Sequence, residues 1–168
     1  MAKNIQTAIV NSMGSKLNFK YGSVIFTKKQ IYTGINNEQN CIKNFITFGK
    51  SIKYTCTHAE VAVLKRIYEK FIRREKIRYS HNFSRKMRKY KIITARTTTN
   101  EMDGINVLSG RPCKDCFEFI KKMNIKKLYY TIPDINGKYG FVKINTNKTR
   151  NNYTLTDCQK RMENLRLK

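Results

Sequence analysis

Acidic side chains are scarce in this sequence of 168 residues. Asp and Glu total 11 against 35 Lys and Arg, which gives a formal net charge of +24. A surplus of this size favours anionic partners such as polynucleotides, nucleotide phosphates or an acidic surface. The alternative is compositional drift, because an AT-rich genome enriches Lys, Asn and Ile in any case. Charge alone therefore leaves both interpretations open.

Long hydrophobic runs are also missing. No stretch approaches the ~20 apolar residues of a membrane span, and no N-terminal run has the form of a signal peptide. We therefore expect an intracellular protein, cytoplasmic or nuclear and not secreted, with no membrane partner. The five cysteines are an odd number, and two of them form a Cys-x-x-Cys pair, a pattern that is not typical of a disulfide framework. Cys41, Cys56 and Cys158 are expected to be reduced thiols.

The pattern of apolar residues and turn signals predicts an α/β protein. With 168 residues and 40% hydrophobic content, the chain is expected to form one domain, residues 1–168. Apolar spacing and turn residues predict the following elements in order: a helix in 1–16, a strand hairpin of 21–26 and 30–36, a helix in 59–72, a strand in 89–98, a loop in 99–110, a helix after Pro112, and strands in 126–132 and 139–144.

The chain ends, in this interpretation, with a hairpin and a basic tail. Residues 133–137 are a strong turn signal, and so short a connection makes the two flanking strands antiparallel. A basic tail, residues 147–168, follows, with a short helix expected after Thr156.

Two short segments carry the chemistry. The first places His58 and Glu60 two residues apart, and the second is Pro112-Cys113-x-x-Cys116. Each segment stands where a helix is expected to begin, with Thr55 or Thr57 as the N-cap of one and Pro112 as the first helical residue of the other. Cys113 and Cys116 then share one face at a helix N-terminus, whose positive dipole end favours the thiolates that a metal needs.

Taken separately, each segment has an ordinary explanation. A lone Cys-x-x-Cys pair is often redox-active or half of a structural zinc site, and a lone histidine is more often a satisfied surface or core residue. Together they supply three zinc ligands, and three protein ligands with a fourth position left to water is the catalytic arrangement. We therefore predict that His58, Cys113 and Cys116 bind Zn²⁺. Cys56 is a weaker alternative ligand.

The combined His-x-Glu…Pro-Cys-x-x-Cys pattern resembles the zinc-dependent cytidine deaminase-like superfamily, of cytidine or deoxycytidylate deaminase type. The resemblance implies a three-layer α/β/α fold, with a mixed five-stranded sheet, an antiparallel C-terminal hairpin and the two zinc-bearing helices side by side. It also implies a hydrolytic enzyme that converts cytosine to uracil in a nucleoside, a nucleotide or a polynucleotide. Glu60 would be its catalytic acid and base, moving protons between water and the base.

A second resemblance concerns substrate binding. Residues 19–22 and 34–38 are similar to the opening of free-nucleoside cytidine deaminases. This similarity would place Phe19 against the base, and Asn36 and Glu38 on the sugar. The alternatives are that Phe19 is ordinary core and that Asn36 begins a turn.

Two backbone groups complete the expected site. The resemblance places the amide of Ala59 and the carbonyl of Arg111 beside the base edge and the leaving amine. The chain departs from nucleoside enzymes at two positions, because those enzymes commonly have Ser where Arg111 stands and Cys where His58 stands. The branch of the superfamily is therefore left open.

The basic surplus is concentrated between residues 65 and 91. This segment holds 12 Lys and Arg interleaved with aromatic residues, and 73–91 is expected to be an insertion. It could bind RNA or single-stranded DNA, or it could be the solvated face of a helix and a polar loop. The alternative function is thus a catalytically idle deaminase-fold protein that binds nucleic acid or has a structural role. Homo-oligomers are common among relatives of this topology, and the chain could form one.

Overall fold

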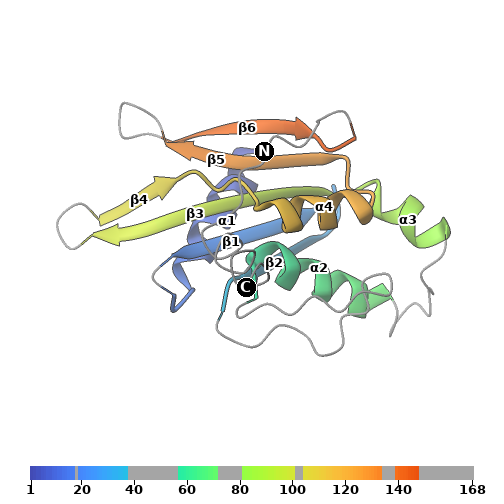
Figure 1. Cartoon of the computed structure of the whole chain (residues 1–168), viewed down its shortest axis with the longest axis horizontal. Helices are drawn as coiled ribbons and strands as arrows, with labels where there is room; N and C mark the ends of the chain where they lie inside the picture. The colour runs from blue at the N-terminus through green and yellow to red at the C-terminus, as the bar shows by residue number, and fades with distance from the viewer. Residues whose placement is uncertain (18, 38–56, 72–80, 101–103, 134–138, 148–168) are drawn as a thin grey trace, which may run out of the picture.

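Three layers, with helices on both faces of a single mixed sheet, make up the protein (Figure 1). The computed structural model describes residues 1–17, 19–37, 57–71, 81–100, 104–133 and 139–147. The predicted three-layer α/β/α architecture is confirmed. Whether residues 1–168 form one domain stays a prediction.

The sheet has a five-strand path, β2-β1-β3-β5-β6, and a sixth strand, β4, that pairs with β3. The strands are β1 (Lys20–Phe26), β2 (Ile31–Ile35), β3 (Lys91–Asn100), β4 (Gly104–Leu108), β5 (Lys127–Pro133) and β6 (Tyr139–Asn145). Among these described strands, β3 and β5 form the one parallel pair. The predicted antiparallel C-terminal hairpin is confirmed as β5–β6.

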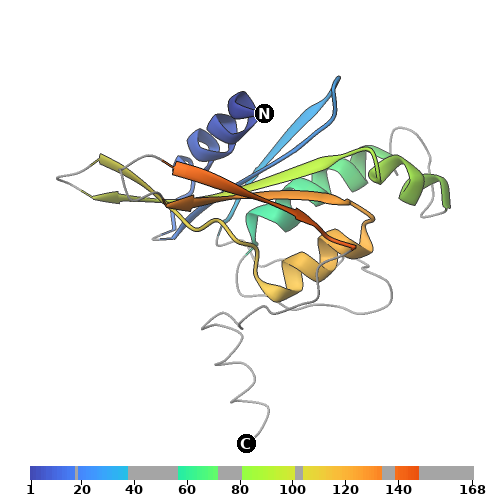
Figure 2. The ribbon, with the colours of Figure 1, turned by 90° about the horizontal axis from the view of Figure 1, so that it is seen from above.

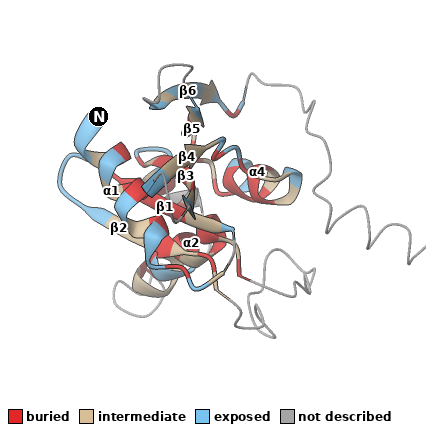
Figure 3. Cartoon of the chain, turned by 90° about the vertical axis from the view of Figure 1, so that its left-hand side faces the viewer, coloured by how far each residue is buried: buried red, intermediate tan, exposed pale blue. Residues whose placement is uncertain are grey.

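Helices cover the two faces of this sheet unequally (Figure 2). Helix α1 (Ala2–Met13) packs on one face through Ile5, Ala8 and Ile9. The opposite face is covered by α2 (Ala59–Glu69), α3 (His81–Met87) and α4 (Lys114–Lys122). Buried residues gather where these helices meet the sheet (Figure 3), as expected for amphipathic helices.

The sequence did not predict two of these elements correctly. The loop expected over residues 99–110 contains β4, which pairs with β3 and begins at Gly104, where φ is +72°. Strand-favouring residues are present in this segment, namely threonines 97–99, Ile105 and Val107. In the prediction from sequence, the neighbouring polar and glycine residues outweighed them. Within the expected insertion, α3 is a separate helix, because Phe83 and Met87 are fully buried one turn apart.

Close contact between β2 and α2 fixes where the second helix begins. A Cβ atom added at Gly34 would stand 2.6 Å from the backbone nitrogen of Val63 and 2.7 Å from the carbonyl oxygen of Ala59. Both atoms belong to the backbone of α2, so a side chain at this position would push the helix away from the sheet. Gly34 therefore holds the first turn of α2 against β2.

Several predictions fall on residues outside the described part of the chain. They are Glu38, the cysteines at 41, 56 and 158, residues 73–80 of the basic insertion, and nearly all of the tail at 147–168. Among the helices in the described ranges, none is both long enough and apolar enough to cross a bilayer.

Candidate metal and active site

The first part of the site is the N-terminus of α2. His58 is the N-cap residue, with an extended backbone, and its carbonyl oxygen accepts the first helical hydrogen bond from Ala62 at 2.9 Å. The prediction of Thr57 as the cap is wrong by one residue, and Thr55 lies outside the described residues. The difference matters, because a side chain at the cap projects from the end of the helix and not along its flank.

The second part is the N-terminus of α4. Cys113 is the N-cap, and its sulfur accepts a hydrogen bond from the amide of Cys116 at 3.4 Å. The prediction that Pro112 is the first helical residue is wrong, because the helix begins at Lys114. The sulfur of Cys113 takes the role that a Ser or Asp oxygen usually fills at the N-cap.

Two threonines on the parallel strands β3 and β5 hold the segment that leads into α4. Thr94 of β3 donates to the carbonyl of Gly110 at 2.5 Å, and Thr131 of β5 donates to the carbonyl of Leu108 at 2.9 Å. The amide of Gly110 in turn donates to the backbone of Thr131 at 2.9 Å. These bonds attach the approach to Cys113 to the edge of the sheet where α/β proteins usually bind ligands.

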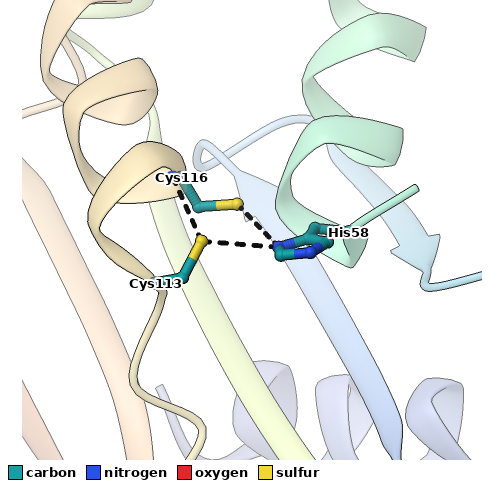
Figure 4. Close-up of side chains that lie close together, drawn as sticks. All are labelled: His58, Cys113 and Cys116. Atoms are coloured by element: carbon teal, nitrogen blue, oxygen red, sulfur yellow. Dashed lines mark hydrogen bonds between the residues drawn. The ribbon is translucent and has the colours of Figure 1, made fainter. Parts of the chain in front are cut away.

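The three predicted ligands converge (Figure 4). His58 Nδ1 lies 3.4 Å from the sulfur of Cys113 and 3.3 Å from that of Cys116, and the three donor atoms are within 4.8 Å of one another. A tetrahedral zinc with ordinary bond lengths separates a nitrogen from a sulfur ligand by about 3.6 Å. The donor set and its spacing therefore fit Zn²⁺. Within the described ranges, the cluster contains these three donors and no fourth.

The two thiols differ in acidity because one donates a hydrogen bond to the other. This bond, with a further contribution from His58, lowers the pKa of Cys113 to about 5. The same bond, together with burial, raises the pKa of Cys116. One thiolate is thus stabilised at neutral pH before any metal binds, which favours capture of a cation.

Glu60 is buried beside this cluster in the first turn of α2. Its side chain is 3% exposed, and burial raises the pKa of the carboxyl group to about 7, with the Cys113 charge adding to the increase. His58 and a hydrogen bond with Cys116 act in the opposite direction. A carboxyl group whose pKa lies near neutrality both accepts and donates protons readily, as an acid and base catalyst must.

The predicted substrate-binding residues have different environments. Phe19 is 62% exposed, Ala59 is buried at the start of α2, and Arg111 is exposed. Asn36 is buried: its Oδ1 accepts from the amide of Tyr21 at 2.7 Å, and its Nδ2 donates to the carbonyl of Phe19 at 2.6 Å. In this structure Asn36 therefore fixes the backbone on which Phe19 is carried.

Sequence reasoning missed a neighbouring pair, Tyr21 and Arg96. They face each other across β1 and β3. The Arg96 guanidinium lies 4.7 Å from the ring centre of Phe19 and 5.4 Å from that of Tyr21. The signal available in the sequence was an arginine in the middle of a strand whose other interior residues are apolar or threonine.

Comparison with known proteins agrees with this geometry. Residues 2–132 match the family model described as the cytidine and deoxycytidylate deaminase zinc-binding region. A search of curated proteins found no match.

Solved structures were also compared with the chain. A cytidine deaminase from Burkholderia pseudomallei aligns with a TM-score of 0.52 and 14% identity, covering 91% of this chain and 98% of that one. A dCMP deaminase from the cyanophage S-TIM5, solved with dCMP and dUMP, has a TM-score of 0.42 and 19% identity, covering 77% and 78%. The first similarity shows the fold; the identity is too low to carry more.

Proposed function

Because the chain belongs to the family of the cytidine and deoxycytidylate deaminase zinc-binding region, we propose that it is a zinc-dependent hydrolase acting on cytosine. Water would add at C4 of the base and ammonia would leave, so that cytosine becomes uracil. The observation that carries this proposal is the convergence of His58, Cys113 and Cys116 beside the buried carboxyl group of Glu60. A structural zinc site is closed by four protein ligands and needs no buried carboxyl group beside it, so the three-donor set next to Glu60 favours a catalytic site.

Zinc and Glu60 would have separate roles. Zinc held by the three donors would lower the pKa of a water ligand to ~7. Glu60 would accept one proton from water and deliver it to the ring nitrogen. It would then accept the second proton, from the hydroxyl group formed on C4, and deliver it to the departing amine, so that the C4 oxygen becomes the carbonyl of uracil. A single carboxyl group suffices for both transfers, since each delivery returns it to the carboxylate that the next acceptance needs.

Backbone groups and one ring would orient the base. In this proposal the amide of Ala59 and the carbonyl of Arg111 contact the base edge and the amine, which leaves both side chains free to vary. Phe19 would pack on the base with its exposed ring. Asn36, and Glu38 outside the described residues, would contact the sugar.

Mass spectrometry of a substrate panel tests this function. The zinc-loaded chain is incubated with cytidine, deoxycytidine, their monophosphates, and short RNA and DNA, and uracil products are measured. Glu60→Ala should abolish uracil formation while one zinc per chain remains bound. Normal turnover by that variant would contradict the role of Glu60, and the absence of uracil from every substrate would contradict the function itself.

A second candidate, nucleic-acid binding, is supported by a basic cavity at the far end of α2. The cavity has a volume of about 530 Å³ and contains four lysines and no acidic residue among its lining residues, which are Thr27, Lys28, Lys29, Gln30, Phe71, Lys86, Lys89 and Tyr90. Lysines so arranged attract phosphates. Phe71 and Tyr90 are buried, so the cavity favours contacts to the nucleic-acid backbone over base stacking.

Fluorescence anisotropy with single-stranded RNA and DNA tests this candidate. Because each neutralised phosphate releases counterions, binding should weaken steeply with salt. Reversing two charges with Lys28→Glu and Lys89→Glu should weaken it further. The same double change at Lys3 and Lys16, which lie elsewhere on the surface, is the control. Equal loss in both variants would show that net charge, and not the cavity, is responsible.

A further inference from the structure

The face of the sheet beneath the zinc ligands carries a cationic side chain that the reaction itself does not need. Ile25 and Ile92 are cross-strand partners and pack in the core with α2 and α4. Residues two apart on a strand point to the same face. Two further pairs, Ser23 with Thr94 and Tyr21 with Arg96, therefore lie on that face.

Arg96 is placed next to the metal ligands. It is two residues beyond Thr94, whose hydroxyl holds Gly110 just ahead of Cys113. The hydroxyl of its partner Tyr21 is within electrostatic range of Glu60 and both cysteines, as well as of Arg96 itself. Tyr21 therefore lies between Arg96, which is 5.4 Å from its ring centre, and the residues around the metal site.

The guanidinium of Arg96 is held by aromatic rings. It lies near the rings of Phe19 and Tyr21, at 4.7 and 5.4 Å from their centres. Cation–π contacts of this kind leave the N–H groups of an arginine able to donate hydrogen bonds. Its Nε is buried and makes no hydrogen bond, and an unpaired buried donor costs about 1–3 kcal/mol, more when it is charged.

A second unpaired atom lies on the same face. Among the described residues, the buried side-chain N and O atoms without a hydrogen-bond partner are Ser23 Oγ and Arg96 Nε, on adjacent strands. Buried polar groups are normally paired, so this part of the site matches a ligand that brings its own acceptors. A planar guanidinium with an unpaired Nε–H matches the oxygens of a phosphate.

We propose that Arg96 is the specificity residue of the site and binds a phosphate group of the substrate, so that the enzyme prefers phosphorylated cytosine compounds to free nucleosides. The phosphate is either a 5′-monophosphate or a phosphodiester of a polynucleotide. The predicted preference in turnover rests on the proposed deaminase function. The predicted binding of a phosphate by Arg96 does not depend on turnover and can be tested without it.

The test compares phosphorylated and unphosphorylated ligands in wild type, Arg96→Gln and Arg96→Lys, all zinc-loaded. The control is Arg88→Gln, an exposed arginine ahead of the opposite end of β3. Isothermal calorimetry with dUMP and deoxyuridine measures the affinity gained from the phosphate. We expect this ratio to be at least about 30-fold in wild type and in the control, and close to one in Arg96→Gln. Arg96→Lys should retain part of it, because lysine keeps the charge and loses the planar fork.

Turnover distinguishes the two sources of phosphate. The ratio of kcat/KM for deoxycytidine monophosphate to that for deoxycytidine, and the same ratio for a five-nucleotide DNA, are measured in each variant. The ratio that falls with Arg96→Gln identifies the source. Two results would overturn the inference. In the first, Arg96→Gln leaves the preference for dUMP and both turnover ratios unchanged. In the second, wild type binds dUMP no better than deoxyuridine and shows no preference for the oligonucleotide. If wild type makes no uracil but loses a dUMP preference on Arg96→Gln, the deaminase proposal fails and the phosphate site stands.

Discussion

At the scale of single residues, the proposed reaction depends on one carboxyl group kept out of water. Glu60 is buried with its pKa raised to about 7, from 4.5 in the unfolded chain. A raised pKa means that the folded state holds its proton over a range where the unfolded state has lost it. The free energy of unfolding should therefore fall as the pH rises from about 4.5 to about 7, and change little outside that range.

This residue-scale prediction is measured as a difference between variants. In the zinc-free protein, urea unfolding of wild type is compared with Glu60→Gln across pH 4 to 8. The wild type should lose about 3 kcal/mol relative to the variant over this range. The Cys113 thiolate makes the free energy of unfolding rise with pH in both proteins, so its contribution cancels in the difference between them. Glu69→Gln, at the other end of α2, is the control. A difference that does not vary with pH would contradict the buried position of Glu60.

The metal ligands were predictable from the sequence because their signal is local chemistry in a fixed order. The caps were not, since His58 and Cys113 differ from their predicted neighbours in backbone angles that residue type alone does not determine. Arg96 could not be found either. Its closeness to Tyr21 follows from strand register, which joins residues 75 positions apart.

At the scale of elements, the position of α2 against β2 should control metal affinity. Gly34→Ala would bring a methyl group within 2.6 Å of the α2 backbone, so the helix must move, and His58 with it. We expect zinc affinity to fall at least about 10-fold, because ligand placement within a fraction of an ångström decides metal binding. Competition with a chromophoric chelator measures this.

Gly14→Ala is the matched control for this element-scale prediction. A Cβ at Gly14 would meet only the carbonyl of Asn11, at 3.4 Å, and its φ of −71° suits any residue. Its zinc affinity should remain within about 2-fold of wild type. An equal loss in both variants would show that the contact between Gly34 and α2 does not position His58.

Most elements were predictable from their periodicity, and the two failures share a cause. In β4 and α3 the tertiary contacts outweighed the local signal: β4 is stabilised by pairing with β3, and α3 by burial of Phe83 and Met87. Neither partner is visible in a short window of sequence. By contrast, the antiparallel β5–β6 pair was predictable, because its turn and alternating pattern are adjacent in the chain.

At the scale of the whole molecule, zinc should link two halves of the chain. His58 and Cys113 are 55 residues apart and belong to helices that share one core cluster with the central strands. A ligand that binds only the folded state stabilises it, by about 2.7 kcal/mol at a free concentration 100 times the Kd. Thermal unfolding with and without a chelator should show this gain. His58→Ala should abolish it, and a gain that persists in that variant would place the metal elsewhere.

The most direct test of the central claim is X-ray absorption spectroscopy at the zinc edge on the purified chain. The account predicts one zinc per chain, with two sulfur ligands near 2.3 Å and two lighter atoms near 2.0–2.1 Å, one of them a histidine nitrogen and the other water. A third sulfur or second histidine in place of water would close the position that the reaction needs. Either result, or a chain that binds no zinc, would contradict the proposed hydrolytic function.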